Sequence, residues 1–169
     1  YIPYNYVWED HWGNTTYKAP YRGTDFWQTT AQNQCLYMTK RYGLDWIITT
    51  DVDEYIWITD PGALNSIDPP PVQAFLSQFS DRPDLGSLRM DSVAFGRNTK
   101  VEPISKEFEL IVDYTCRKIR FPKPGVHFKQ FWKSQVALDL TIHFLTEGGK
   151  TLPLDVASQA RIHHFKQPW

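Results

Sequence analysis

The sequence is poor in the features that mark several common classes of protein. Its two cysteines, Cys35 and Cys116, form no CxxC pair, which argues against a structural zinc site and leaves one possible disulfide. No apolar run approaches the roughly 18 residues that a bilayer span requires, and no charged-then-apolar leader opens the chain. We therefore expect no transmembrane segment within this chain, so that any membrane anchor lies outside it.

An excess of either sign of charge is also missing. Lys and Arg number 18 and Asp and Glu number 19 among 169 residues. Proteins that follow a nucleic-acid backbone or an anionic membrane need surplus positive charge. We therefore expect no nucleic-acid partner.

What the sequence does contain is apolar and aromatic material. Hydrophobic residues make up 41% and aromatic residues 15% of the chain, which is enough for one packed core and predicts a single domain over residues 1–169. Aromatic rings fill cores, but they also stack on sugar rings. Residues 1–24 mix Tyr, Trp, Pro, Gly and Asn without a period, which is typical of an extended loop.

The first half of the chain predicts an alternation of helices and strands. Apolar residues recur at helical spacing from Asp25 to Tyr42, and Gly43 ends this pattern. The β-branched run from Leu44 to Thr50 predicts a strand covered on both faces of an α/β sheet. A turn is predicted at Asp60-Pro61-Gly62, and a short helix over Val72–Phe79.

The second half predicts mainly short strands. Residues 107–120 are ambiguous, because their apolar spacing fits a helix while Ile111-Val112 favours a strand, and we expect a helix. Gly148-Gly149 predicts a hairpin turn. The predicted strands cover residues 85–90, 93–95, 130–132, 138–144, 152–154 and 161–165.

An acidic cluster directly follows the predicted strand of residues 44–50. Asp51, Asp53 and Glu54 lie within four residues, at a place where open α/β sheets bind ligands. Carboxylate oxygens suit Mg²⁺ or Mn²⁺, and such a cation can bridge to the phosphates of a nucleotide. The cluster therefore predicts a metal and nucleotide site, although acidic clusters also occur as solvated turns.

A phosphatase is a different interpretation of the same residues. It would make Asp51 a nucleophile that accepts a phosphoryl group. Such enzymes place small, flexible residues after Asp-x-Asp, whereas the bulky run Tyr55-Ile56-Trp57 follows here. We rank the phosphatase below a metal and nucleotide site.

An ordered set of motifs resembles glycosyltransferase family 92. That family shows an Asn-x-Cys-Leu-like helix, a Trp-containing strand, an Asp-x-Asp-Glu-aromatic motif, a Phe-Gly segment and a closing His-aromatic motif. The corresponding segments here are residues 32–36, 45–48, 51–56, 95–96 and 162–165, with Gly148-Gly149-Lys150 before the last.

The resemblance implies a fold, a donor and a reaction. It implies an α/β fold of GT-A type, a mixed sheet flanked by helices, which here lacks a counterpart of the family's opening βαβ portion before Asp25. It also implies a nucleoside-diphosphate sugar donor such as a UDP-sugar, held through Mn²⁺ or Mg²⁺, and inverting transfer. Where family members have small residues after Phe-Gly, this chain has Arg97-Asn98-Thr99.

The resemblance also suggests metal ligands. Asp53 is expected to bind the metal directly, and Asp51 to contact the metal or the donor ribose. His164 would complete the site from the far end of the chain, with His163 as its alternative. Because neighbours on a strand point to opposite faces, only one of these histidines should face the site.

Inverting transfer also needs a general base for the acceptor hydroxyl, and a carboxylate is the usual choice. Asp91 is our first candidate, with Glu107 and Glu109 behind it, and Glu54 is expected to orient the ligands or lie near the acceptor. His143 could contact the donor diphosphate or the acceptor, with a core histidine as the alternative. The basic group Arg117, Lys118 and Arg120 could face phosphates, with a solvated surface as the alternative. Trp46 and Trp57 are assigned to the core and the site wall.

The predicted function is that of a metal-dependent inverting glycosyltransferase, which moves a hexose such as galactose to a glycan hydroxyl. The alternative is a non-catalytic carbohydrate-binding or interaction module. If the resemblance holds, the protein is membrane-anchored or lies in the Golgi lumen through a segment outside this chain.

Overall fold

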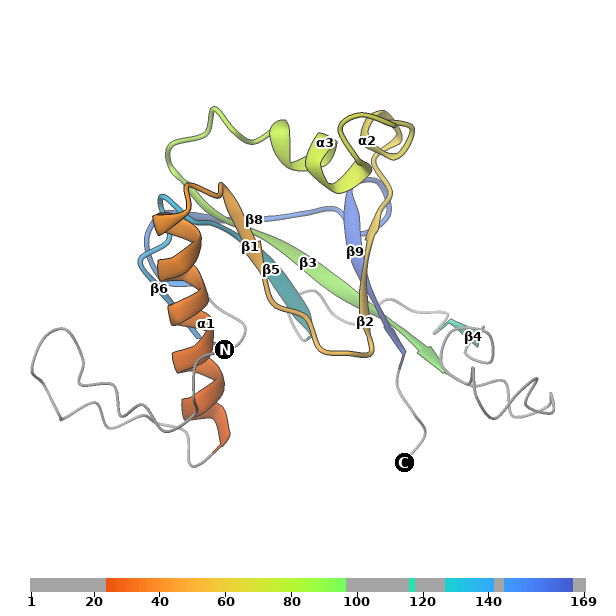
Figure 1. Cartoon of the computed structure of the whole chain (residues 1–169). Coiled ribbons are helices and arrows are strands. Elements are labelled where there is room, and N and C mark those ends of the chain that lie inside the picture. The colour runs from red at the N-terminus through yellow and green to blue at the C-terminus, as the bar shows by residue number, and fades with distance from the viewer. Residues whose placement is uncertain (1–23, 97–115, 118–126, 142–144, 166–169) are drawn as a thin grey trace, which may run out of the picture.

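The computed structural model describes residues 24–96, 116–117, 127–141 and 145–165, and in these ranges the chain forms a mixed α/β fold. A curled mixed sheet of seven strands and a second sheet of two strands accompany three helices (Figure 1). The helices are α1 (Thr24–Arg41), α2 (Pro61–Leu64) and α3 (Pro71–Ser77). The strands are β1 (Trp46–Ile48), β2 (Glu54–Ile58), β3 (Leu85–Gly96), β4 (Cys116–Arg117), β5 (Phe128–Lys133), β6 (Asp139–Leu140), β7 (Leu145–Glu147), β8 (Lys150–Pro153) and β9 (Ala160–Phe165). The predicted α/β class is confirmed, and the GT-A type stays a prediction.

Strand β3 is the centre of the larger sheet. It pairs antiparallel with β5 and parallel with β9, and β1 and β2 lie beyond these two partners. Strand β8 pairs parallel with the first half of β3, and β4 pairs with its end. Among the described strands β1 therefore has one neighbour, and its three residues are only partly buried. Although β1 lies at a sheet edge, Trp46 and Ile48 pack against the larger apolar cluster and Ile47 packs against the smaller one on the opposite face. The prediction of a strand covered on both faces is therefore confirmed in part, with side chains that stay partly buried.

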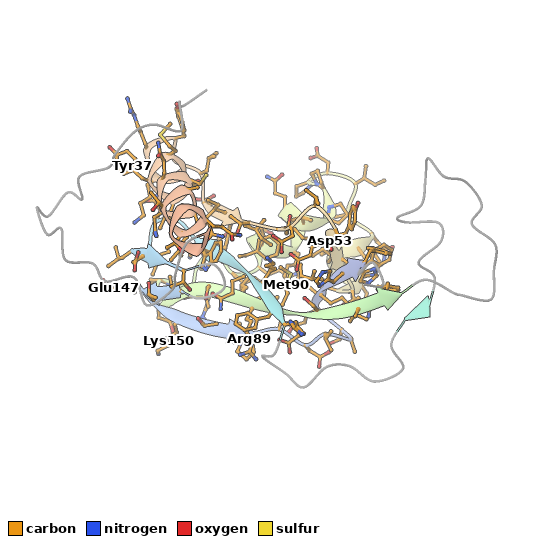
Figure 2. All side chains as sticks on the ribbon, turned by 90° about the horizontal axis from the view of Figure 1, so that it is seen from below. Tyr37, Asp53, Arg89, Met90, Glu147 and Lys150 are labelled. Carbon is orange, nitrogen blue, oxygen red and sulfur yellow. The ribbon has the colours of Figure 1, made fainter. Side chains whose placement is uncertain are left out.

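The alternation of side chains along the strands produces two apolar clusters. Leu88, Met90 and Phe131 point to the face that α2 and α3 cover, in the larger cluster. Trp132 follows Phe131 directly, so it points to the other face and packs with Leu36 of α1. Figure 1 shows α1 beside the β1 end of the sheet and α2 with α3 at the other end. We call the face of Met90 the helix-covered face; Figure 2 shows Asp53 on the same side of β3 as Met90, and Arg89 on the other.

Hydrogen bonds cap the C-terminal end of α1 and the N-terminal end of α2. Gly43, at a φ of 66°, ends α1, and the N–H groups of Leu44 and Gly43 donate to the carbonyls of Thr39 and Lys40. Asp60 accepts a hydrogen bond from the N–H of Ala63 and caps α2. The predicted turn at Asp60–Gly62 is thus the start of a short helix.

The other predicted elements are confirmed in part. Strands β3, β5, β8 and β9 and helices α1 and α3 lie where the patterns predict them, and β6 covers part of the strand predicted at residues 138–144. Strand β2 was not predicted. Cys116–Arg117 is a strand, so the helix predicted over residues 107–120 is wrong there, and its remaining residues lie outside the described ranges. Cys35 is exposed and free.

The glycine pair at residues 148–149 makes a turn of a different kind from the predicted hairpin. Both residues have positive φ, which favours glycine. However, β7 before them pairs with β6, whereas β8 after them pairs with β3. The turn therefore carries the chain from the small sheet into the large one, and the hairpin prediction is wrong. No helix among the described residues is long and apolar enough to cross a membrane.

Candidate functional site

The acidic segment forms a tight turn between β1 and β2. The backbone N–H of Glu54 donates to the carbonyl of Asp51 at 3.1 Å, and the N–H of Asp51 donates to the Glu54 carboxylate at 3.0 Å. These reciprocal bonds close the turn, and Val52 lies at its exposed tip. The local sequence thus presents three carboxylates from one turn, with Glu54 buried as the first residue of β2.

Strand β9 brings His164 to this turn from the far end of the chain. Glu54 lies directly opposite His164 in the antiparallel pair of β2 and β9, so their side chains share one face. The Nε2 atom of His164 lies 3.2 Å from Oδ2 of Asp53, and its Nδ1 lies 3.7 Å from Oε1 of Glu54. The N–H of Phe165 donates to the carbonyl of Asp53 at 2.9 Å, which ties the turn to β9.

A lysine outside the sequence motifs completes the group. Lys129 lies in β5, opposite Met90 of β3, and its side chain is 3% exposed. Its Nζ lies 3.0 Å from Oδ2 of Asp51 and 3.1 Å from Oε2 of Glu54. We define the polar cluster as Asp51, Asp53, Glu54, Lys129 and His164.

Lys129 supplies a positive charge beside the acids of the turn. The sequence predicts a divalent cation that offsets their charges, whereas the ammonium group of Lys129 already pairs with Asp51 and Glu54. A buried carboxylate such as Glu54 needs a charged partner of this kind. Across the described residues, no group of three or more His, Cys, Asp or Glu side chains is placed to hold a metal ion.

Asp53 and His164 are the two members that keep the geometry of metal ligands. Adjacent ligand atoms on an octahedral cation with bonds of about 2.1 Å lie about 3 Å apart. Oδ2 of Asp53 and Nε2 of His164 are 3.2 Å apart, and both side chains are partly exposed. Mg²⁺ takes only one or two protein ligands when water and phosphate oxygens supply the others, and imidazole also suits transition metals. The two residues therefore fit a divalent cation that a phosphate ligand shares.

His163 points to the other face of the sheet. Its ring stacks on Trp57 with centroids 5.1 Å apart and lies 4.6 Å from the ring of Phe95. The Nε atom of Arg161 donates to its Nε2 at 2.9 Å. The structure thus brings His164, and not His163, to the acids.

Asp91 is also on this second face. It follows Met90 in β3, and its carboxylate lies 3.5 Å from Nε of Arg89. Because Met90 shares the helix-covered face with Lys129, the alternation of β3 directs Asp91 away from the polar cluster. The structure does not bring Asp91 together with Asp53 and His164.

Some of the remaining candidates lie within the described residues and the others lie outside them. Trp46 is partly buried and packs against the larger apolar cluster, as predicted for the core. Trp57 is 49% exposed on the face of His163, so its assignment to the core and the site wall is wrong. Arg117 lies in β4 opposite Phe95. Five further candidates lie outside the described residues: Glu107, Glu109, Lys118, Arg120 and His143.

The sequence around Lys129 carries a signal of its buried position. It stands in the strand Phe128–Lys133, where Phe131 shares its face. A lysine within an apolar strand face is rarely buried unless it is paired. The pattern could have indicated a buried ion pair, but not its partners, because Asp51 lies 78 residues away.

A comparison with models of protein families gives a match. A model of glycosyltransferase family 92 matches residues 5–168 of the chain. Curated proteins gave no match. The matched span includes every residue of the polar cluster.

Proposed function

The chain belongs to glycosyltransferase family 92, and we propose that its polar cluster binds a nucleoside-diphosphate sugar together with a divalent cation. Family membership implies glycosyl transfer, with a sugar donor and an acceptor. The proposal adds that the donor is a UDP-sugar, that the sugar is a hexose such as galactose, and that a glycan hydroxyl accepts it with inversion. It depends above all on the 3.2 Å approach of Asp53 to His164.

The residues of the cluster would have different roles in binding the donor and its cation. Asp53 and His164 would hold Mn²⁺ or Mg²⁺, and the half-exposed carboxylate of Asp51 lies beside them on the same turn. When bound, the cation would offset the negative charge of the diphosphate leaving group. Buried Glu54 lies between Lys129 and His164 and would keep both side chains in place.

The transfer itself is a single displacement. The acceptor oxygen forms a bond to the anomeric carbon, the bond from that carbon to the diphosphate oxygen breaks, and the diphosphate leaves with the electron pair. The hydroxyl proton goes to a carboxylate base, which has to lie within hydrogen-bond reach of the acceptor. Asp91, the base that the sequence predicts, lies on the other face of β3 from the polar cluster, so its role is the first to test.

The central experiment measures metal and donor binding on the same protein. Mn²⁺ affinity is read from the electron paramagnetic resonance signal of free Mn²⁺, and turnover from the hydrolysis of UDP-galactose and other UDP-hexoses. We expect Asp53→Asn and His164→Gln each to weaken Mn²⁺ binding at least about tenfold and to abolish metal-dependent hydrolysis. His163→Gln is the matched control, because this neighbour points to the other face.

The outcomes separate the proposal from its alternatives. Equal Mn²⁺ affinity in the wild type and in the Asp53 and His164 variants would contradict a metal at this pair. Glycan binding without hydrolysis or transfer of any donor would identify the non-catalytic module. Trapping of an acyl-phosphate on Asp51 would identify the phosphatase instead.

A further inference from the structure

The buried Lys129 divides the polar cluster into two parts. The fixed part is Asp51 and Glu54, which pair with Lys129, and the free part is Asp53 and His164, which do not. We propose that Lys129 is a positioning residue that keeps Asp51 and Glu54 away from the cation, so that Asp53 and His164 alone serve as its protein ligands. This inference rests on the proposed function of the cluster. It concerns a residue that no motif of the family resemblance includes.

The fixed part is held by direct contacts. Lys129 Nζ lies 3.0 Å from Asp51 and 3.1 Å from Glu54, and both paired oxygens belong to the turn that precedes β2. The oxygen of Glu54 that faces Lys129 also accepts the N–H of Asp51. One ammonium group and one backbone N–H therefore set the directions of two carboxylates.

The free part lacks such contacts with Lys129. Asp53 projects from the same turn, but its partner is His164, and its side chain is 33% exposed. A cation that arrives from solvent can reach Asp53 and His164 without displacing an ammonium group. To bind the oxygens of Asp51 and Glu54 that face Lys129, the cation would have to displace a buried ammonium group. At the other oxygens of these two carboxylates it would compete with the same ammonium group for their negative charge.

A second lysine of β5 shows what a purely structural role looks like. Lys133 lies four residues further along, and its Nζ donates to the backbone carbonyls of Phe79, Ser80 and Arg82. These bonds fasten the segment after α3 to the sheet. Lys129 instead directs its ammonium group at two carboxylates of the candidate site, so Lys133 supplies a matched control on the same strand.

Removing the positive charge of Lys129 should strengthen metal binding. The three acids and Lys129 carry a formal charge of minus two, and Lys129→Met makes it minus three while it releases two carboxylates. A divalent cation within several ångströms then gains about tenfold in affinity from the added charge alone. We therefore expect Lys129→Met to bind Mn²⁺ about tenfold more tightly than the wild type when no donor is present.

The experiment compares Mn²⁺ binding by four proteins with the same resonance assay. They are the wild type, Lys129→Met, Lys129→Arg and Lys133→Met, each checked for folding by circular dichroism. Lys129→Arg keeps the charge and should bind Mn²⁺ as the wild type does. Lys133→Met should also leave the affinity unchanged. If Lys129→Met does not fold, the double variant Lys129→Met/Glu54→Gln removes the buried unpaired carboxylate and still releases Asp51, and it should bind Mn²⁺ more tightly than Glu54→Gln alone.

Each result decides the inference. Tighter Mn²⁺ binding by the Lys129→Met proteins, with unchanged Lys129→Arg and Lys133→Met, supports it. Unchanged or weaker binding by folded Lys129→Met, or by the double variant, overturns it and leaves Lys129 a structural residue. If the wild type binds no Mn²⁺, the metal step of the proposed function fails. In that case a gain of binding in Lys129→Met still supports the role of Lys129, and no binding by either protein overturns it.

Discussion

Replacing Lys129 by methionine also has a large expected effect on folding. The change removes the charged partner of Glu54, whose side chain is 5% exposed, and of Asp51, whose side chain is 54% exposed. Breaking a buried ion pair by removing one partner costs about 3–5 kcal/mol, whereas an exposed pair contributes about 0–1 kcal/mol. We therefore expect a loss of about 3–5 kcal/mol in the free energy of unfolding, nearly all of it from Glu54. For a chain of 169 residues this corresponds to a fall in Tm of about 6–20 °C.

The assay is urea denaturation at pH 7 of a double-mutant cycle. Lys129→Met, Glu54→Gln and the double variant are each measured, together with Lys133→Met as the control on the same strand. Because the double variant leaves no buried carboxylate without a partner, it should be more stable than Lys129→Met alone. Their coupling should be about 2–3 kcal/mol, within the range for residues in contact and above the value for exposed pairs. A loss below about 1 kcal/mol for Lys129→Met, or additive effects in the cycle, would refute the buried ion pair.

Three further predictions test other parts of the molecule. Gly86→Ala should destabilise the fold by at least about 2 kcal/mol in thermal denaturation, because an added Cβ would collide with the carbonyl of Gly148; a stable variant would contradict that close approach. Hydrogen bonds from the hydroxyl and N–H of Ser158 hold the pKa of Asp155 below its ordinary value, so their stabilisation is present above the unfolded-state pKa and is lost as pH falls through the lowered one. An NMR titration of the Ser158 amide should show this change below about pH 4, and a midpoint above that value would be the contrary result. Asp91→Asn should retain donor turnover because Asp91 faces away from the polar cluster, whereas a loss of kcat beyond about a hundredfold would restore it as the base.

Local patterns predicted those parts of the fold that depend on near neighbours. The helical spacing before Gly43 gave α1 and its end, since that glycine supplies the positive φ of the cap. The runs in β3, β5 and β9 were recognised because their side chains alternate or are apolar throughout. Strand β2 was missed because its sequence, Glu54 to Ile58, begins with an acid whose burial depends on Lys129 and His164.

Errors arose where distant parts of the chain decide the outcome. The glycine turn at 148–149 looks like a hairpin until β8 pairs with β3, more than 60 residues away in sequence. Trp57 looks like a core residue, but the face it occupies is set by the register of β2 with β9. The prediction that His164 lies near Asp53 came from the family resemblance alone. Local sequence could not supply it, because the contact depends on the same register of β2 with β9.

The pairing of β2 with β9 also has a consequence for the order of folding. Glu54 and His164 are directly opposite one another, yet 110 positions of chain separate them, and closing so long a loop costs entropy before any contact compensates it. The turn with its acids and the buried Lys129 can form within the earlier strands, whereas the pair of Asp53 and His164 exists only after β9 has docked. A ligand that binds this pair binds the native state alone, so it draws the equilibrium toward the docked strand by mass action. The amide of Phe165, which donates to Asp53, should then exchange with solvent more slowly in the presence of such a ligand.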